Sequence, residues 1–409
     1  MFFKSDHKQK LAWTRQQCCP IVKSSAESTY DFSSLTSILK HKRVVWLGEN
    51  GHQIAEVNHL KAELVRFLYE QLDFKVVIFE SGIGECFAAN INKQHKQAQA
   101  LMQQSIFSLW HTEEMVPLFQ MLSNTDLQMA GMDMQPSADM AHMYEVIAHN
   151  EQLSADGKEH FRTVQHFCKH WYAKMSTYRA KHRFRKQLPA DLKNEYELAK
   201  QNMQQRCIEV ETELHALLAQ TDDDDASLFQ FLLHYLKNLQ QFIAVIDQPV
   251  TVYIERRDQQ MAENVNWLLH HYYPHQKAII LAHNNHIFKS TRSVNSFCAA
   301  GSQISDDLLQ SSYYIGTFMY EGETHTASGV QYKLSKPPKN SVEAYMNASD
   351  HFISFMDVQS VAHTESYSWL NDKVYFMDSG TIAKRMIVKQ EFDGLFFIKT
   401  ISLPHYIHK

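Results

Sequence analysis

The sequence predicts an α/β fold with a mostly parallel central sheet flanked by helices and a large helical insertion over the cleft. Short apolar runs alternate with amphipathic runs in the first third of the chain, which is typical of a parallel sheet with right-handed crossovers. A long stretch with almost no glycine, rich in Gln, Lys, His, Leu and Glu, then interrupts this alternation. Strand-like apolar runs return in the last third, so the sheet is expected to continue after the insertion.

Three strands are expected in the first third of the chain. Residues 44–47 and 75–80 are apolar on both faces, as central parallel strands are, and a third strand starts near Asp126. Residues 55–72 place apolar side chains at helical spacing. Residues 106–124 predict another helix, in which Pro117 either kinks the helix or belongs to its first turn.

The pattern divides the chain into four parts. Residues 1–40 are an N-terminal lead-in of loops and a short helix at 35–40, and residues 41–136 form the first half of the α/β core. Residues 137–250 are the helical insertion, a lid or pocket wall whose Met, Phe and Tyr residues suggest an apolar ligand. Residues 251–409 complete the core with a helix over 256–272 and strands at 277–283, from Ser312 and from Gly394.

Composition favours a cytoplasmic protein without nucleic-acid or membrane partners. It does not bear on small molecules, and the small-molecule substrate that we expect follows from the polar residues described below. The 409 residues carry a formal net charge of −5, and a nucleic-acid binder needs a basic surface. Asp6, Lys8 and Lys10 stand where a signal peptide needs an apolar core, and no apolar run approaches the length of a membrane span. The six cysteines show no CxxC spacing and favour free thiols, while the oligomeric state stays open.

Polar side chains follow several of the expected strands at the point where each strand ends. The parallel arrangement would bring them to one edge of the sheet, where histidines beside carboxylates favour proton transfer. His52 is the expected catalytic base and Glu49 its support. The full set at these strand ends is Glu49, His52, Glu80, Asp133, His283 and His286.

Two other chemistries use the same residue types. His52, His283 and His286 with a glutamate could bind zinc, iron or manganese, but their spacing does not match HExxH. A nucleophilic serine would need an elbow such as GxSxG, and the sequence has none; Ser81 is the nearest candidate. Water activated by a base is therefore favoured, with no cofactor expected and a divalent metal as the alternative.

An ordered set of short motifs over about residues 40–355 resembles the erythromycin esterase family of macrolide-inactivating hydrolases. The second strand ends on the family's acid at Glu80. The remaining motifs are Gly48-Glu49-x-x-His52 with Glu56, Trp110-x-x-Glu113, Gly131-x-Asp133-x-Gln135, Arg257-Asp258-x-x-Met261-Ala262-x-Asn264 and Ala282-His283-Asn284-x-His286.

The resemblance implies an α/β sheet with a helical insertion that forms a deep cleft, and hydrolysis of an ester or a macrocyclic lactone. It assigns the general base to His52, with a supporting catalytic set of Glu49, Glu80, Arg257, His283 and His286. Substrate binding falls on Glu56, Lys61, Glu113, Asp133 and Gln135. An arginine common in the family is replaced by Lys61, which removes a planar bidentate donor and makes a macrolide a candidate substrate only.

Three hypotheses follow. In the first, His52 activates water without a metal, and Arg257 with protonated His283 or His286 stabilises the oxyanion. In the second, a bound metal acidifies the water, or the same His/Glu cleft carries out an elimination. In the third, the cleft belongs to a non-enzymatic protein that binds haem or another small molecule.

Overall fold

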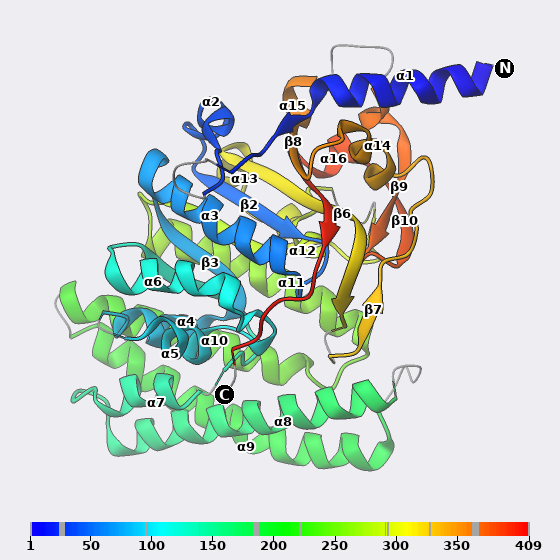
Figure 1. Cartoon of the computed structure of the whole chain (residues 1–409). Coiled ribbons are helices and arrows are strands. Elements are labelled where there is room, and N and C mark those ends of the chain that lie inside the picture. The colour runs from blue at the N-terminus through cyan, green and yellow to red at the C-terminus, as the bar shows by residue number, and fades with distance from the viewer. Residues whose placement is uncertain are drawn as a thin grey trace.

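A computed structural model describes residues 2–23, 29–94, 96–138, 140–182, 188–220, 223–290, 292, 294–326, 329–361 and 368–407. Within these ranges nine strands form one sheet in the order β1–β8–β11–β6–β2–β5–β3–β4, with β7 paired to β6 (Figure 1). Six consecutive strands, from β11 to the edge strand β4, are parallel, as predicted. They are β2 (Val44–Glu49), β3 (Phe74–Gly82), β4 (Gln128–Asp133), β5 (Lys277–His283), β6 (Ser312–His325) and β11 (Gly394–Ile401).

Of the two outer strands on the β11 side, β8 runs against this direction and β1 runs along it. β8 (Ile353–Asp357) pairs antiparallel with β11, and the two-residue strand β1 (Cys19–Pro20) pairs antiparallel with β8. β7 (Gln331–Lys333) folds back on β6 as a hairpin. β9 (Lys373–Asp378) and β10 (Ile382–Ile387) form a separate two-stranded sheet.

The sheet is covered on both faces, which explains why its central strands are apolar throughout. Val44 and Trp46 of β2 pack into one apolar cluster with α11 (Val250–Trp267), whereas Val45 and Leu47 pack into the opposite cluster with α3 (Ala55–Leu72). Because successive side chains of a strand point to opposite faces, every residue of β2 is buried.

Shorter helices complete the core. They are α1 (Phe2–Gln17), α2 (Thr36–Leu39), α4 (Ile83–Ile91), α5 (Ala98–Ser105), α6 (Val116–Asn124), α12 (Asn284–Ile287), α13 (Asp306–Gln310), α14 (Val342–Met346), α15 (Val358–Val361) and α16 (Val388–Glu391). All six cysteines of the sequence are free thiols in the structure. Among the residues described, no helix combines the length and the apolar character that crossing a bilayer requires.

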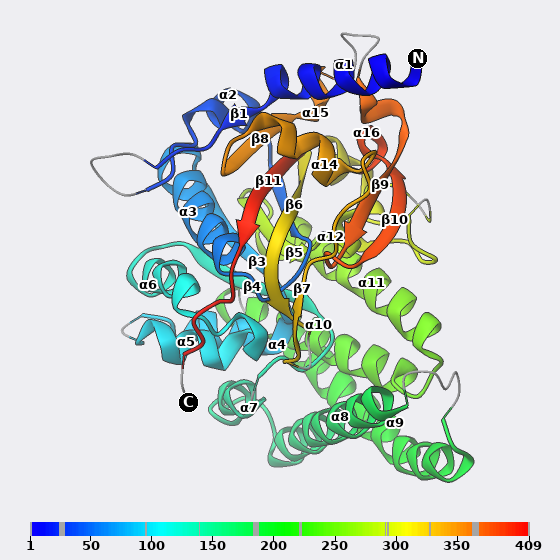
Figure 2. The ribbon, with the colours of Figure 1, turned by 45° about the vertical axis from the view of Figure 1, so that its right-hand side comes forward.

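Residues 137–250 contain the expected long helices. They are α7 (Ala141–Ala148), α8 (Ala155–Lys181), α9 (Ala190–Leu218) and α10 (Asp223–Val245). α8 and α9 lie side by side beyond the sheet, and Figures 1 and 2 show them at the lower end of the molecule. These helices share an apolar cluster that includes Phe161, Trp171, Tyr196 and Phe242.

Three local predictions were wrong in part. The lead-in contains α1, a helix of 16 residues whose Trp13 is buried against the core. The helix expected over 106–124 is two 3₁₀ turns, at Ser108–Trp110 and Glu113–Met115, followed by α6, and Pro117 stands in the first turn of α6, where its missing N–H costs no hydrogen bond. The helix expected over 256–272 starts earlier, at Val250, and ends as a π-helical turn, Leu268–Tyr272.

Candidate active site

The polar residues that follow the parallel strands meet at one edge of the sheet. In the β2–β5 register Glu49 lies opposite His283, and Phe79, just before Glu80, lies opposite Leu281. A cavity of about 560 Å³ opens at this edge. Its lining residues are Gly51, His52, Gln53, His283, Asn285, His286, His325, Thr326, Tyr332, Lys333, Ser379 and Thr381. They come from the core and its hairpins rather than from residues 137–250, where we expected a lid or pocket wall.

Close packing at the end of β2 helps to fix this edge. Gly48 has no room for a side chain, because a Cβ there would stand 2.1 Å from Oδ1 of Asn284. The Asn284 amide in turn donates a hydrogen bond to the Thr317 carbonyl at 3.0 Å, which links the exit of β5 to β6. The glycine before Glu49 therefore permits β2 and the turn after β5 to approach closely.

His52 is held from behind by a buried carboxylate. Its Nδ1 lies 2.6 Å from Oε1 of Glu49, which also accepts a hydrogen bond from the indole N–H of Trp110 at 2.9 Å. The ammonium of Lys61 binds the other oxygen, Oε2. Burial alone would raise the pKa of Glu49, but Lys61 and His52 outweigh it and lower that pKa. Glu49 is thus a carboxylate that orients His52.

These contacts assign the tautomer of His52. An ionised carboxylate only accepts hydrogen bonds, so in the neutral ring of His52 Nδ1 carries the proton and Nε2 has the lone pair. The His52 side chain is 25% exposed and lines the cavity, whereas Glu49 is fully buried. A neutral imidazole with its lone pair toward a cavity can accept a proton from water.

His283 has the opposite arrangement. Its Nδ1 accepts a hydrogen bond from the backbone N–H of Asn285 at 3.1 Å, so Nε2 carries the proton in the neutral ring. Burial, followed by the neighbouring His52, lowers the pKa of His283 to about 3. The two rings lie 5.0 Å apart between centroids. We expected either His283 or His286 to be protonated; the lowered pKa disfavours the charged form of His283, whose neutral ring still offers an N–H donor.

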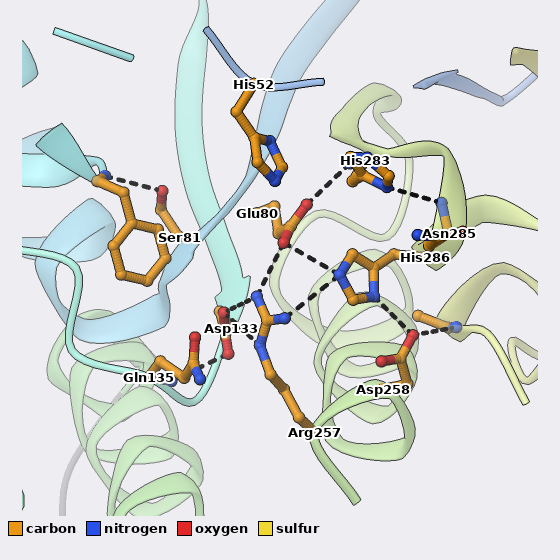
Figure 3. A network of polar contacts seen from close by, with 12 residues as sticks. His52, Glu80, Ser81, Asp133, Gln135, Arg257, Asp258, His283, Asn285 and His286 are labelled. Atoms are coloured by element: carbon orange, nitrogen blue, oxygen red, sulfur yellow. Dashed lines mark hydrogen bonds and ion pairs between the residues drawn. The ribbon is translucent and has the colours of Figure 1, made fainter. Parts of the chain in front are cut away.

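An ionic cluster lies beneath the two histidines (Figure 3). Arg257 donates to Oε1 of Glu80 at 2.8 Å and, through Nε, to Oδ2 of Asp133 at 2.9 Å. His286 lies between two carboxylates, with Nε2 3.2 Å from Glu80 and Nδ1 2.8 Å from Asp258. Because Arg257 and His286 are both engaged by carboxylates, they are poorly placed to stabilise an oxyanion, contrary to our expectation.

Charges within the cluster reinforce one another. Burial opposes protonation of His286, but Asp258 and Glu80 outweigh it and raise its pKa to about 10. Burial would likewise raise the pKa of Glu80, yet His286 and Arg257 hold it well below its usual range. The second oxygen of Glu80 accepts the backbone N–H of His283 at 2.8 Å. The cluster thereby fixes the backbone that carries His283.

The raised pKa of His286 predicts how stability depends on pH. The charged ring stabilises the folded state fully below its ordinary pKa of 6.5, and this contribution is lost as pH rises through about 10. The free energy of unfolding of wild type should therefore exceed that of His286→Gln most at pH 6, and the gap should shrink toward pH 10. Urea titrations across this range measure it, and a gap independent of pH contradicts a charged His286.

Known proteins resemble this chain over most of its length. The sequence model described as erythromycin esterase matches residues 69–401. The chain belongs to the erythromycin esterase family. It is 25% identical to the putative hydrolase YbfO of Bacillus subtilis, over 97% of this chain and 92% of that protein. It is 23% identical to the erythromycin esterase type II of Escherichia coli, over 97% and 99%.

A solved structure shows the same fold. The erythromycin esterase mutant EreC, in its open conformation, superposes with a TM-score of 0.66 and 16% identity, covering 92% of this chain and 95% of that one. The α/β fold with a mostly parallel sheet is thus the fold of an erythromycin esterase. Membership of the family supports a hydrolase function for the chain.

The structure places the five residues expected to bind substrate away from the cavity lining. Lys61 is buried and binds Glu49, and Asp133 is buried and binds Arg257, because each balances an opposite charge. Gln135 donates to the Tyr253 hydroxyl. Glu56 accepts from Ser402, and Glu113 is exposed with its backbone N–H bound to the carbonyl of His405.

Sequence reasoning missed several residues of the site. Trp110 and Asp258 stand inside motifs shared with the erythromycin esterase family, so the motifs pointed to them without giving their roles. His325, Tyr332 and Lys333 come from the β6–β7 hairpin, and nothing in the local pattern links that hairpin to His52.

The donor groups around the cavity bear on metal binding. In the part of the chain that the structure describes, no three His, Cys, Asp or Glu side chains are grouped as metal ligands. Both ring nitrogens of His286 face carboxylates, and Nδ1 of His283 is bound to a backbone N–H. Nε2 of His52 and Nε2 of His283 are better described as a base and a hydrogen-bond donor.

Proposed function

We propose that the chain hydrolyses a carboxylic ester or lactone, with His52 as the general base. The observation that carries this proposal is the contact of His52 Nδ1 with buried Glu49, which leaves Nε2 of a cavity-lining ring as the proton acceptor. Of the two histidines that follow β5, His283 holds its proton on Nε2 in the neutral ring, and Asp258 and Glu80 favour the charged ring of His286. His52 is therefore the histidine best suited to activate water.

The reaction needs no covalent intermediate. Nε2 of His52 takes a proton from water as the water oxygen bonds to the carbonyl carbon, and the carbonyl π electrons move onto oxygen. The Nε2–H of His283 is the proposed donor to this oxyanion. When the tetrahedral species collapses, the bond to the alcohol oxygen breaks, and His52 returns its proton to the leaving alkoxide. Glu49 stabilises the imidazolium that exists between these steps.

The residues that line the cavity favour a polar substrate. Of the described lining residues none is aliphatic or acidic, and most carry hydroxyl, amide or imidazole groups. Among the residues that the structure describes, Oδ1 of Asn285 and Nδ1 of His325 are buried and have no hydrogen-bond partner. An unpaired buried polar atom is costly, and a bound donor would relieve that cost. We therefore expect an ester that carries hydroxyl or other polar groups rather than the apolar ligand suggested by the helical insertion.

A hydrolysis screen followed by mass spectrometry tests the proposed function. The screen should contain macrolides, because one relative is named for erythromycin, together with sugar esters and simple alkyl esters. The expected product is substrate plus one water for a lactone, or the separate acid and alcohol for an open ester. Turnover that is absent for all esters, or equal in the His52→Ala protein, contradicts the proposal.

Glu49→Gln tests the support behind the base. A glutamine amide can donate to Nδ1 of His52, which would shift the ring proton to Nε2 and remove the lone pair that faces the cavity. We expect kcat to fall ~10²–10⁴-fold with little change in KM, since the tautomer and not the binding surface is altered. Steady-state kinetics measure the effect. Glu63→Gln, which alters a carboxylate paired with Arg66 on α3, is the matched control and should keep wild-type kcat.

A further inference from the structure

The chain after β11 lies against two segments of the active site. We call residues 402–407 the C-terminal strap; in Figures 1 and 2 it leaves β11 and runs toward the region of α5 and α6. Its Ser402 carbonyl accepts the backbone N–H of Ala55 at 3.1 Å, at the end of the loop that carries His52. Its other end pairs with residues 111–113, next to Trp110: the Ile407 N–H donates to the carbonyl of His111 at 3.0 Å.

Two carboxylates hold the strap in place. Glu56 accepts the backbone N–H of Ser402 at 2.8 Å and its hydroxyl at 2.6 Å. Glu114 accepts the backbone N–H of His405 at 3.0 Å, and its Oε1 lies 2.8 Å from the ring Nδ1. Glu56, which the motif suggested as a substrate ligand, thus serves this attachment.

Tyr406 connects the strap to the residue beside the proposed base. Its hydroxyl donates to Oε1 of Gln53 at 2.5 Å. The Gln53 amide donates to the Thr326 carbonyl at 3.2 Å, and the Thr324 hydroxyl donates to the Gln53 carbonyl at 2.8 Å. Gln53 is 5% exposed, so both ends of its amide and its backbone are fixed. The Tyr406 bond is the only one of these three contacts that comes from the strap.

We propose that Tyr406 is a positioning residue for the catalytic base and acts through Gln53. The inference rests on the proposed function, because it assumes that His52 carries the chemistry. A base must stand within hydrogen-bond reach of the water it activates, and small displacements of such a group are costly in rate. Tyr406 fixes the residue that directly follows His52.

The test is Tyr406→Phe, which keeps the ring and removes the hydroxyl alone. Loss of one hydrogen bond should lower kcat about three- to tenfold, with KM within about twofold of wild type. Tyr69→Phe is the matched control, since its hydroxyl donates to surface Asp126 at the same 2.5 Å and far from the cavity. The control should keep wild-type kcat.

A double-mutant cycle separates positioning through Gln53 from a general structural role. If Tyr406 acts through Gln53, then Gln53→Leu with Tyr406→Phe should lower kcat no further than Gln53→Leu alone. Additive effects, or wild-type kcat in Tyr406→Phe, overturn the proposal. If Tyr406→Phe is fully active while His52→Ala is inactive, only the role of Tyr406 fails; if His52→Ala is also active, the proposed function fails with it.

Discussion

Replacing His52 with alanine should lower kcat ~10²–10⁴-fold, the usual contribution of a general base. The fold should survive, because the side chain is partly exposed and its loss leaves Glu49 still bound to Lys61 and Trp110. Steady-state kinetics on the best substrate of the ester screen measure the effect, and a thermal melt checks the fold.

His59→Ala is the matched control for this variant. His59 lies on α3, the helix that follows the His52 loop. It lines a different cavity, together with Tyr30, Glu56 and Glu114. Its replacement should leave kcat near the wild-type value. Equal losses in both variants would indicate damage to α3 rather than removal of a base, and near-normal turnover in His52→Ala would end the assignment.

The largest loss of stability is expected from Arg257→Met. The guanidinium pairs with Glu80 and Asp133, whose side chains are 5% and 0% exposed. Without it Glu80 still has His286 at 3.2 Å, but Asp133 loses its ion pair with Arg257. Removing one partner of a buried ion pair typically costs ~3–5 kcal/mol. Urea denaturation measures the free energy of unfolding. The free energy of unfolding of Arg257→Lys should fall between those of wild type and Arg257→Met, because an ammonium keeps the charge but not the planar fork that spans two carboxylates.

The preceding residue supplies the control. Arg256 is exposed and donates to Gln259 at 2.8 Å on the same helix. Surface substitutions of this kind usually change stability by no more than ~0.5 kcal/mol. If Arg256→Met and Arg257→Met destabilise the chain equally, the buried cluster contributes no more than an ordinary surface contact.

Much of the sheet could be predicted from local pattern. Residues 55–72, 277–283 and 394–401 match α3, β5 and β11 because apolar periodicity and strand-length runs are local properties. The meeting of His52, Glu80 and His283 at one edge followed from parallel strands, whose carboxyl ends lie together.

The pairing of charges at the site could not be predicted in the same way. Lys61 and Asp133 were expected to face substrate, and each is instead buried against an opposite charge. The demand of a buried charge for a partner depends on which side chains surround it, and that depends on the packing of distant segments. For the same reason, no local pattern pointed to the β6–β7 hairpin or to the contact of Tyr406 with Gln53.

The end of the sheet at β1 has a consequence for contacts between molecules. A bare strand edge offers a row of free amide and carbonyl groups on which another chain can add a strand. Here the outermost strand is only Cys19–Pro20, and proline has no amide hydrogen to donate. A neighbouring molecule that approached this side would find almost no hydrogen-bonding ladder to extend, so the N-terminal segment protects the sheet from edge-to-edge aggregation.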